Sequence, residues 1–322
     1  MAAANKPLKI GLIGGSGDAW NHLSAFVHSQ RVSSVALCEV DQATVARVRN
    51  RFGIVKSVTA DHHDLLGDPE ISVVDVNLPP AEQPRPVIEA LQAGKHVLCA
   101  APLADTVEEA EAMVAAAESS AGRLMCVLYQ RFIPAHVRAR QLLEEEVIGQ
   151  PVLGSVSTVI SDQQPTSAEV FHSLDFLRHS LGEAETVTAV WRERTEEQPQ
   201  AALLTLEMAG GVVAQVSILA MPDIHRPIAE RKLLGSEGQM LIRDNPEDEL
   251  PLVVIQQDGF FPIKLRNPPD VREYATIAAL EHLLGCLVEE KPEAVTVTEA
   301  LAAQRLLIAA TEAAREGRRV VL

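Results

Sequence analysis

A glycine-rich turn at the end of the first apolar run constrains the fold of this chain more than any other feature. The run covers residues 8–13, the turn Gly14-Gly15-Ser16-Gly17-Asp18-Ala19 follows directly, and helical spacing continues over residues 18–30. A strand that enters such a turn and then a helix is typical of the first unit of a parallel sheet, where helix amides face phosphate groups. The turn therefore predicts a doubly wound sheet with a dinucleotide crevice at its carboxyl edge.

The same alternation of short apolar runs with helical segments continues to about residue 128. Further strands are expected at residues 34–38, 72–77, 97–99 and 124–128, and further helices at 42–52, 81–93 and 107–121. Strands and helices that alternate in this way favour parallel strands with helices on both faces of the sheet. Residues 1–128 are therefore predicted to form an α/β, dinucleotide-binding domain of the Rossmann type.

The pattern changes after about residue 150, where strands follow one another with tight turns between them. Helices are expected at residues 167–181, 275–289 and 298–316. Strands are expected at residues 152–160, 186–191, 201–208, 212–220, 231–234, 240–242 and 252–256. Sequential strands with short connections favour an antiparallel sheet. Residues 129–322 are therefore predicted to form a second, α+β domain.

Composition excludes several classes of function. The chain has 28 Lys and Arg against 44 Asp and Glu, a formal net charge of −16. This acidity disfavours binding to nucleic acid or to an anionic membrane, because both need clustered cations. No apolar run reaches the roughly 20 residues that a membrane-spanning helix needs, and no signal peptide is recognised at the start.

The four cysteines, Cys38, Cys99, Cys126 and Cys286, lie far apart along the chain. Their positions favour buried free thiols in a reducing compartment, and hence a cytoplasmic location. No spacing of cysteine and histidine resembles a zinc site, so no metal is expected.

The turn and the next strand predict the cofactor. Gly14, Ser16 and Ala19 occupy the three small-residue places of the dinucleotide fingerprint. Serine replaces glycine at the second place, and Gly17, together with the glycine before Ser16, can compensate by shifting the turn. Glu39 ends the second strand, twenty residues beyond Ala19, where an acidic residue binds the ribose hydroxyls. Since no arginine adjoins Glu39 to hold a 2′-phosphate, NAD is favoured over NADP.

Three further motifs give the chain a family resemblance. They are Ala93-Gly94-Lys95-His96-Val97-Leu98-Cys99 with Pro102-Leu103-Ala104, then Arg131-Phe132-Ile133-Pro134, then His172-Ser173-Leu174-Asp175 with Leu181-Gly182. With the glycine turn, they make the chain from Lys9 onward resemble the Gfo/Idh/MocA oxidoreductases. The resemblance implies a Rossmann domain, a second domain with a large open sheet used for dimer or tetramer contacts, and NAD(P)-dependent chemistry on a sugar or polyol.

Two groups that the resembling family uses for proton transfer are absent. The family's Glu-Lys-Pro is Ala100-Ala101-Pro102 here, and Ala168 stands where its helix motif begins with aspartate. Alanine can neither carry a proton nor stabilise an alkoxide, so neither position can supply the family's acid–base chemistry. The nearest lysine, Lys95, is expected at the opposite edge of the sheet. A family histidine near Gln83 is also missing.

The resemblance then assigns the candidate site residues. His172 is the expected acid/base, and Tyr129, Arg131 and Asp175 are the expected substrate-binding residues. The expected cofactor-binding residues are Gly14, Ser16, Gly17, Ala19, Glu39, Pro79 and Pro102. Competing structural interpretations stay open: a hydrogen-bonded buried His172, a structural contact through Arg131, a packing role for Trp20 and a solvated helix start at His62-His63.

Three functional hypotheses follow. The first is an NAD-dependent oxidoreductase acting on a sugar-like or polyol substrate, with a non-standard proton relay through His172. The second is a catalytically silent homologue that binds a dinucleotide or sugar in a regulatory or structural role. It is suggested because Ala101 and Ala168 replace the lysine and the aspartate of a single proton relay. The third is redox chemistry on a substrate that supplies its own acidity, such as a 3-keto sugar.

Overall fold

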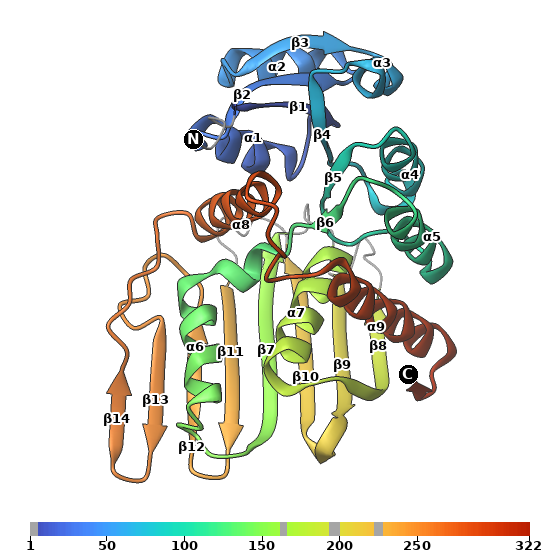
Figure 1. Cartoon of the computed structure of the whole chain (residues 1–322). Coiled ribbons are helices and arrows are strands. Elements are labelled where there is room, and N and C mark those ends of the chain that lie inside the picture. Colours follow the sequence, from blue (N-terminus) through green and yellow to red (C-terminus); the bar gives the residue numbers. More distant parts are fainter. Residues whose placement is uncertain (1–5, 162–165, 193–199, 222–227) are drawn as a thin grey trace. The chain divides into compact units, whose positions relative to one another are not determined.

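The computed structural model describes residues 6–161, 166–192, 200–221 and 228–322. Contacts divide the chain into two compact units (Figure 1). The first unit comprises Met1–Tyr129 and Ala275–Leu301, and the second comprises Gln130–Tyr274 and Ala302–Leu322. The first unit thus takes up part of the C-terminal helical region, which the sequence pattern places wholly in the second domain.

The first unit is built on a six-stranded sheet in the order β3-β2-β1-β4-β5-β6, and every pair of neighbouring strands is parallel. The strand order reverses between β1 and β4, which is where an open α/β sheet binds its ligand. The predicted Rossmann topology is confirmed. The strands are β1 (Leu8–Ile13), β2 (Val32–Cys38), β3 (Val55–Thr59), β4 (Ile71–Val76), β5 (His96–Cys99) and β6 (Leu124–Cys126).

Helices α2, α3 and α5 of the first unit begin at polar side-chain caps that the sequence supplies. The Asp41 carboxylate accepts a hydrogen bond from Thr44 N at 2.9 Å at the start of α2, and the Thr106 hydroxyl accepts one from Glu109 N at 3.2 Å at the start of α5. The helices are α1 (Ala19–His28), α2 (Gln42–Arg51), α3 (His62–Gly67), α4 (Pro84–Gln92), α5 (Val107–Glu118) and most of α8 (Val271–Val288), with the short 3₁₀ turn η1 (Pro80–Glu82).

The second unit is built on a nine-stranded sheet in the order β14-β13-β12-β11-β7-β10-β9-β8-β15. Strands β7 and β10 are parallel and the other neighbours are antiparallel, so the predicted mainly antiparallel sheet is confirmed. The strands are β7 (Pro151–Ser161), β8 (Ala184–Arg192), β9 (Ala201–Met208), β10 (Val213–Met221), β11 (Ile228–Gly235), β12 (Gly238–Arg243), β13 (Leu252–Gln256), β14 (Gly259–Pro262) and β15 (Val320–Val321).

Helices cover one face of this sheet. Helix α7 (Thr166–Leu181) packs on β7, β9 and β10, and α6 (Pro134–Glu144) packs on β12 (Figure 1). The 3₁₀ turns η2 (Tyr129–Phe132) and η3 (Ala209–Gly211) and the long helix α9 (Val297–Glu316) complete the elements. Along β9 and β10, buried residues alternate with exposed ones, so the second face of these strands is open.

Among the described helices, none combines the length and the apolar character that crossing a bilayer requires.

Candidate functional site

The glycine turn closes the carboxyl end of β1 against β4. Gly14 has a φ of +89°, and a Cβ there would lie 2.2 Å from the backbone oxygen of Asn77, so no other residue fits. Ala19 is fully buried where α1 begins, which lets the helix pack closely on the sheet. Ser16 is exposed at the tip of the turn. The backbone therefore forms the cradle that a pyrophosphate needs, with the serine side chain outside the core.

Glu39 lies beside this turn. Its Oε2 accepts a hydrogen bond from Gly15 N at 3.0 Å, and its Oε1 accepts from Val40 N at 2.8 Å and from Asp41 N at 2.9 Å. Three backbone donors thus hold the carboxylate at the carboxyl end of β2. This is the position in which an acidic residue meets the ribose hydroxyls of a dinucleotide.

Three polar side chains that the sequence analysis did not select lie close together near the turn. Asp75 on β4 is fully buried, and its two oxygens lie 3.1 and 2.9 Å from Nδ1 of His22 on α1. Asn77 Nδ2 lies 3.2 Å from the same nitrogen, while the buried Asn77 Oδ1 has no hydrogen-bond partner among the described residues. The only sequence signal was a charged residue inside the apolar run 72–77. The turn at Gly14, the carboxylate of Glu39 and this buried polar cluster lie near the carboxyl ends of β1, β2 and β4, and together they fit a dinucleotide.

The loop after β5 carries no ionisable group where the resembling family has lysine. Ala101 precedes Pro102 in a cis peptide bond, and both are buried. Gln83 braces this loop, because its Nε2 donates to the carbonyl oxygens of Pro102 at 2.7 Å and Leu103 at 3.3 Å. Pro79 leads into η1 after β4. Gln83 thus gives the loop a structural support where the family's histidine is missing.

Lys95 cannot replace the missing lysine, as the sequence predicts. Its Nζ donates to the carbonyl oxygens of Asp68 at 2.8 Å and Ile71 at 2.7 Å, next to the amino ends of β4 and β5. The crevice lies at the carboxyl ends, so this ammonium group serves the opposite edge of the sheet. Lys232, on β11 of the second unit, pairs with Glu230 at 2.8 Å.

In the second unit, two of the expected substrate-binding residues bind each other. Arg131 Nε and Nη2 donate to the Asp175 carboxylate at 2.9 and 2.7 Å, and both side chains are at most 5% exposed. This is a bidentate, charge-assisted pair. His172 is buried on α7, the helix that carries Asp175, and Tyr129 is the half-buried last residue of the first segment of the first unit. Their roles toward a substrate stay predictions.

A cavity of about 170 Å³ opens beside this ion pair, within the second unit. Its lining includes Arg131, Asp175, His136, Arg140 and His179, whereas His172 is not part of it. Arg140 Nη1 donates to the carbonyl oxygen of His179 at 2.7 Å. The cavity is therefore lined by cationic, aromatic and carboxylate groups, and both residues of the Arg131–Asp175 pair belong to its lining.

A second buried polar network lies under α7. Arg231 is fully buried and pairs with Asp244, donates to Gln130 Oε1 at 2.9 Å, and lies 5.2 Å from the ring centre of Phe176. His136 Nε2 lies 2.9 Å from the second oxygen of Asp244. Burial raises the pKa of Asp244, but the charges and hydrogen bonds of Arg231 and His136 together more than offset this effect, and the pKa falls to about 2.

Glu169 belongs to the same network and was not anticipated from the sequence. It follows Ala168 directly and lies one helical turn before His172. Burial raises the pKa of Glu169, although the positive charges of Arg231 and Arg272 act to lower it. A carboxyl group is thus retained on α7 next to the position where the family's aspartate is lost, although it interacts with Thr158 on β7.

A parallel sheet with a glycine turn and an acidic residue after its second strand, followed by a large mixed sheet under helices, is typical of two-domain proteins that bind a dinucleotide. Residues 8–128 match the family model of the Gfo/Idh/MocA oxidoreductases described as an NAD-binding Rossmann fold, and residues 140–322 match the model of its C-terminal alpha/beta domain. The chain belongs to this family. Its cofactor is therefore NAD, which the residues of the turn and Glu39 would hold.

Individual relatives are similar over part of their length. The levoglucosan dehydrogenase of Pseudarthrobacter phenanthrenivorans is 29% identical over 219 residues, which cover 60% of this chain and 56% of that enzyme. An inositol 2-dehydrogenase/D-chiro-inositol 3-dehydrogenase of Shouchella clausii is 26% identical over 257 residues, 74% of this chain and 73% of that protein. The match thus spans little more than half of the levoglucosan dehydrogenase.

A solved structure of levoglucosan dehydrogenase in complex with NADH superimposes with a TM-score of 0.84 at 21% identity, covering 98% of this chain and 99% of that chain. At this identity the likeness establishes the fold.

Proposed function

We propose that the protein is an NAD-dependent oxidoreductase that acts on a sugar-like or polyol substrate by hydride transfer. The observation that carries the proposal is the complete dinucleotide cradle, with Glu39 held beside the Gly14 turn by three backbone amides. When bound, NAD supplies the hydride acceptor. The similar levoglucosan and inositol dehydrogenases support a cyclic polyol as the substrate.

Proton transfer must then use a relay that differs from the family's. Oxidation of an alcohol requires removal of its hydroxyl proton, and Ala101 has no group for this task. We assign the acid/base role to His172, because imidazole titrates near neutral pH without strong tuning. Tyr129, Arg131 and Asp175 are the proposed substrate-binding residues, with Arg131 and Asp175 acting as the pre-formed pair that the structure describes.

The test is turnover with a panel of substrates. The purified chain with NAD and levoglucosan, myo-inositol or related polyols is expected to give a rise in absorbance near 340 nm. His172→Ala should lower kcat by a factor of roughly 10²–10⁴ while NAD affinity stays the same. Turnover unchanged in His172→Ala would remove the assigned acid/base.

A catalytically silent homologue is the alternative, and the residues at Ala101 and Ala168 favour it. It predicts that calorimetry detects NAD binding while no substrate in the panel is oxidised. Measurable hydride transfer would exclude it.

A substrate that supplies its own acidity is the third hypothesis. It predicts that His172→Ala abolishes activity and that Ala101→Lys does not raise it. If the ordinary polyol chemistry holds instead, Ala101→Lys should raise the rate, because it restores a cation in the family's lysine position.

We further propose that the chain is a homodimer or homotetramer that associates through the open face of its nine-stranded sheet. Exposed aliphatic side chains on that face, Val190 and Leu203 among them, support this arrangement. The cytoplasmic location also stays a proposal; four buried free cysteines support it.

A further inference from the structure

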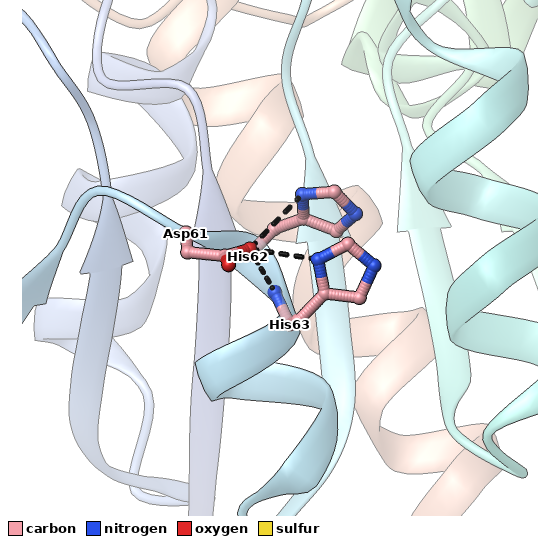
Figure 2. Close-up of side chains that lie close together, drawn as sticks. All are labelled: Asp61, His62 and His63. Carbon is pink, nitrogen blue, oxygen red and sulfur yellow. Dashed lines mark hydrogen bonds and ion pairs between the residues drawn. The ribbon is translucent and has the colours of Figure 1, made fainter.

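Two imidazoles and two carboxylates meet on the surface of the first unit, where α3 begins beside α4. Asp61 caps α3, His62 and His63 begin it, and Glu89 comes from α4. Figure 2 shows the two rings lying one beside the other, with the Asp61 carboxylate next to them. The ring centres are 4.2 Å apart and the planes are tilted by 34°. The expected solvated helix start is therefore also a cluster of potential metal ligands.

The Nε2 atoms of both rings are close to the same oxygen of Glu89. Glu89 Oε2 lies 2.6 Å from His62 Nε2 and 3.5 Å from His63 Nε2. Arg85 Nε donates to the other oxygen, Oε1, at 2.8 Å and so keeps Oε2 turned toward the rings. The hydrogen bonds from Arg85 and His62 lower the pKa of Glu89, so that this group is a carboxylate at neutral pH.

Asp61 determines which nitrogen of His63 carries the proton. Asp61 Oδ1 accepts from His63 N at 2.9 Å and lies 2.7 Å from His63 Nδ1. An ionised carboxylate only accepts hydrogen bonds, so Nδ1 must bear the hydrogen. In the neutral ring, Nε2 then has a free lone pair, which is close to the negatively charged Glu89 Oε2. A carboxylate oxygen and an imidazole lone pair at this distance favour a cation, which would take the place of the hydrogen bond between His62 and Glu89.

We propose that His62 Nε2, His63 Nε2 and Glu89 Oε2 bind a divalent transition-metal ion of the zinc, nickel or copper class. Two imidazoles and one carboxylate are a donor set that such ions prefer. Asp61 is the carboxylate behind a metal-binding histidine, which fixes the ring and its tautomer. On binding, the proton on His62 Nε2 moves to Nδ1 of the same ring, and the ion exchanges water ligands for two metal–nitrogen bonds and one metal–oxygen bond.

Two of the three separations between the proposed ligand atoms are short. Ligand atoms of one tetrahedral zinc ion are separated by roughly 3.3 Å, given bond lengths of about 2.0–2.1 Å. The 3.5 Å between Glu89 Oε2 and His63 Nε2 already matches, and His62 Nε2 has to withdraw by less than about 1 Å from its 2.6 Å contact. The side chains of His62 and Glu89 are 21% and 26% exposed and that of His63 is 56% exposed, so an ion can enter from solvent and water can complete its coordination.

The test is metal titration of the full chain, freed of metal and carrying no polyhistidine tag. Calorimetry with Zn²⁺ at pH 7.5 should give one ion per chain. His63→Ala and Glu89→Gln should each weaken binding at least 10-fold, and Asp61→Asn should weaken it by about 10–100-fold. His28→Ala, which changes an exposed histidine on α1, is the matched control and should leave the affinity unchanged.

A second readout identifies the ligands directly. Bound Cu²⁺ should show coupling to two imidazole nitrogens in its electron paramagnetic resonance spectrum, and His62→Ala should leave one. The absence of saturable Zn²⁺ binding would overturn the proposal, and so would unchanged binding in a His62→Ala/His63→Ala double variant. The proposal does not rest on the oxidoreductase function, so NAD affinity should be the same with and without the metal.

Discussion

At the scale of single residues, Gly14 occupies a position that excludes any side chain. Gly14→Ala would place a Cβ 2.2 Å from the Asn77 carbonyl oxygen, at a φ of +89°. Left-handed backbone alone costs an L-residue roughly 1–2 kcal/mol, and the clash adds to it. We expect NAD affinity to fall at least about 10-fold, equivalent to about 1.4 kcal/mol, as measured by calorimetry.

Gly53→Ala is the matched control for this experiment. A Cβ at Gly53 meets no atom within 4 Å, and its φ is not positive. This variant should therefore keep the NAD affinity and the stability of the natural chain. A Gly14→Ala variant with unchanged NAD affinity would show that the turn does not hold the pyrophosphate.

Residue-level prediction from sequence is strongest where chemistry is local. The fingerprint positions and the acid at Glu39 follow one another along the chain, so their spacing is enough to bring them together. His22 is more than fifty residues from Asp75 and Asn77 and meets them only when α1 packs on β4. Gln83 and the loop at Pro102 are a similar case, since no spacing rule links an amide to carbonyl groups about twenty residues later.

At the scale of elements, the pair Arg131–Asp175 connects η2 to α7, and its removal should affect stability. Asp175→Ala takes the carboxylate away from a guanidinium whose side chain is only 5% exposed. Breaking a buried pair in this way costs about 3–5 kcal/mol. We expect a loss of this size in the free energy of unfolding, measured with urea.

The double variant Arg131→Met/Asp175→Leu is the control, because replacing both charges by apolar groups is often nearly neutral. It should recover most of the stability that Asp175→Ala loses. A loss below about 1 kcal/mol in Asp175→Ala would instead mark the pair as held in place for ligand binding rather than for the fold.

The buried network under α7 predicts a dependence of stability on acid pH. The pKa of Asp244 is about 2 in the folded chain against an ordinary value of 3.8, since Arg231 and His136 together more than offset the effect of burial. A lowered carboxyl pKa contributes stability above the unfolded value, and the contribution is lost as pH falls through the folded value. About 2 kcal/mol should therefore disappear between about pH 4 and pH 2.

Unfolding of Asp244→Asn at pH 5 and pH 2.5 tests this prediction. The variant should be less stable than the natural chain at pH 5, and the difference should shrink at pH 2.5. Asp258→Asn, at an exposed position in the second unit, is the control and should show the same pH dependence as the natural chain. An equal dependence in Asp244→Asn would contradict the assigned pairing.

Element prediction failed where packing overrides local pattern. Strand β3 was missed because only Val55 in Val55–Thr59 is buried, and Lys56 and Ser57 face solvent at the edge of the sheet. Helix α8 was anticipated as a helix, but its periodicity gives no sign of which unit it joins. The proposed metal cluster is a comparable case: His62 and His63 are adjacent in sequence, whereas Glu89 reaches them only through the packing of α3 against α4.

At the scale of the whole molecule, the open face of the nine-stranded sheet carries the prediction of assembly. Strand register aligns Ala201, Leu219, Val159 and Ile228 in one row across β9, β10, β7 and β11. In the neighbouring row, Val190 pairs with Leu203, and these side chains are 58% and 45% exposed. Polar side chains continue this second row at Ser217, Ser157 and Glu230, so the aliphatic patch covers part of the open face. An exposed aliphatic patch of this kind supports an interaction site there.

Leu203→Lys should therefore break the assembly. In a symmetric dimer the same patch comes from both subunits, so one substitution places two ammonium groups in a desolvated contact. Light scattering after size exclusion should give a multiple of 34.8 kDa for the natural chain and the monomer mass for the variant. Val27→Lys is the matched control, because Val27 is 50% exposed on α1 of the other unit and the charge of the new lysine should leave the mass unchanged.

A natural chain that is monomeric at tens of micromolar, or a Leu203→Lys variant of unchanged mass, would show that the open face is not the contact. The residual aliphatic exposure of β8, β9 and β10 would then require a different partner.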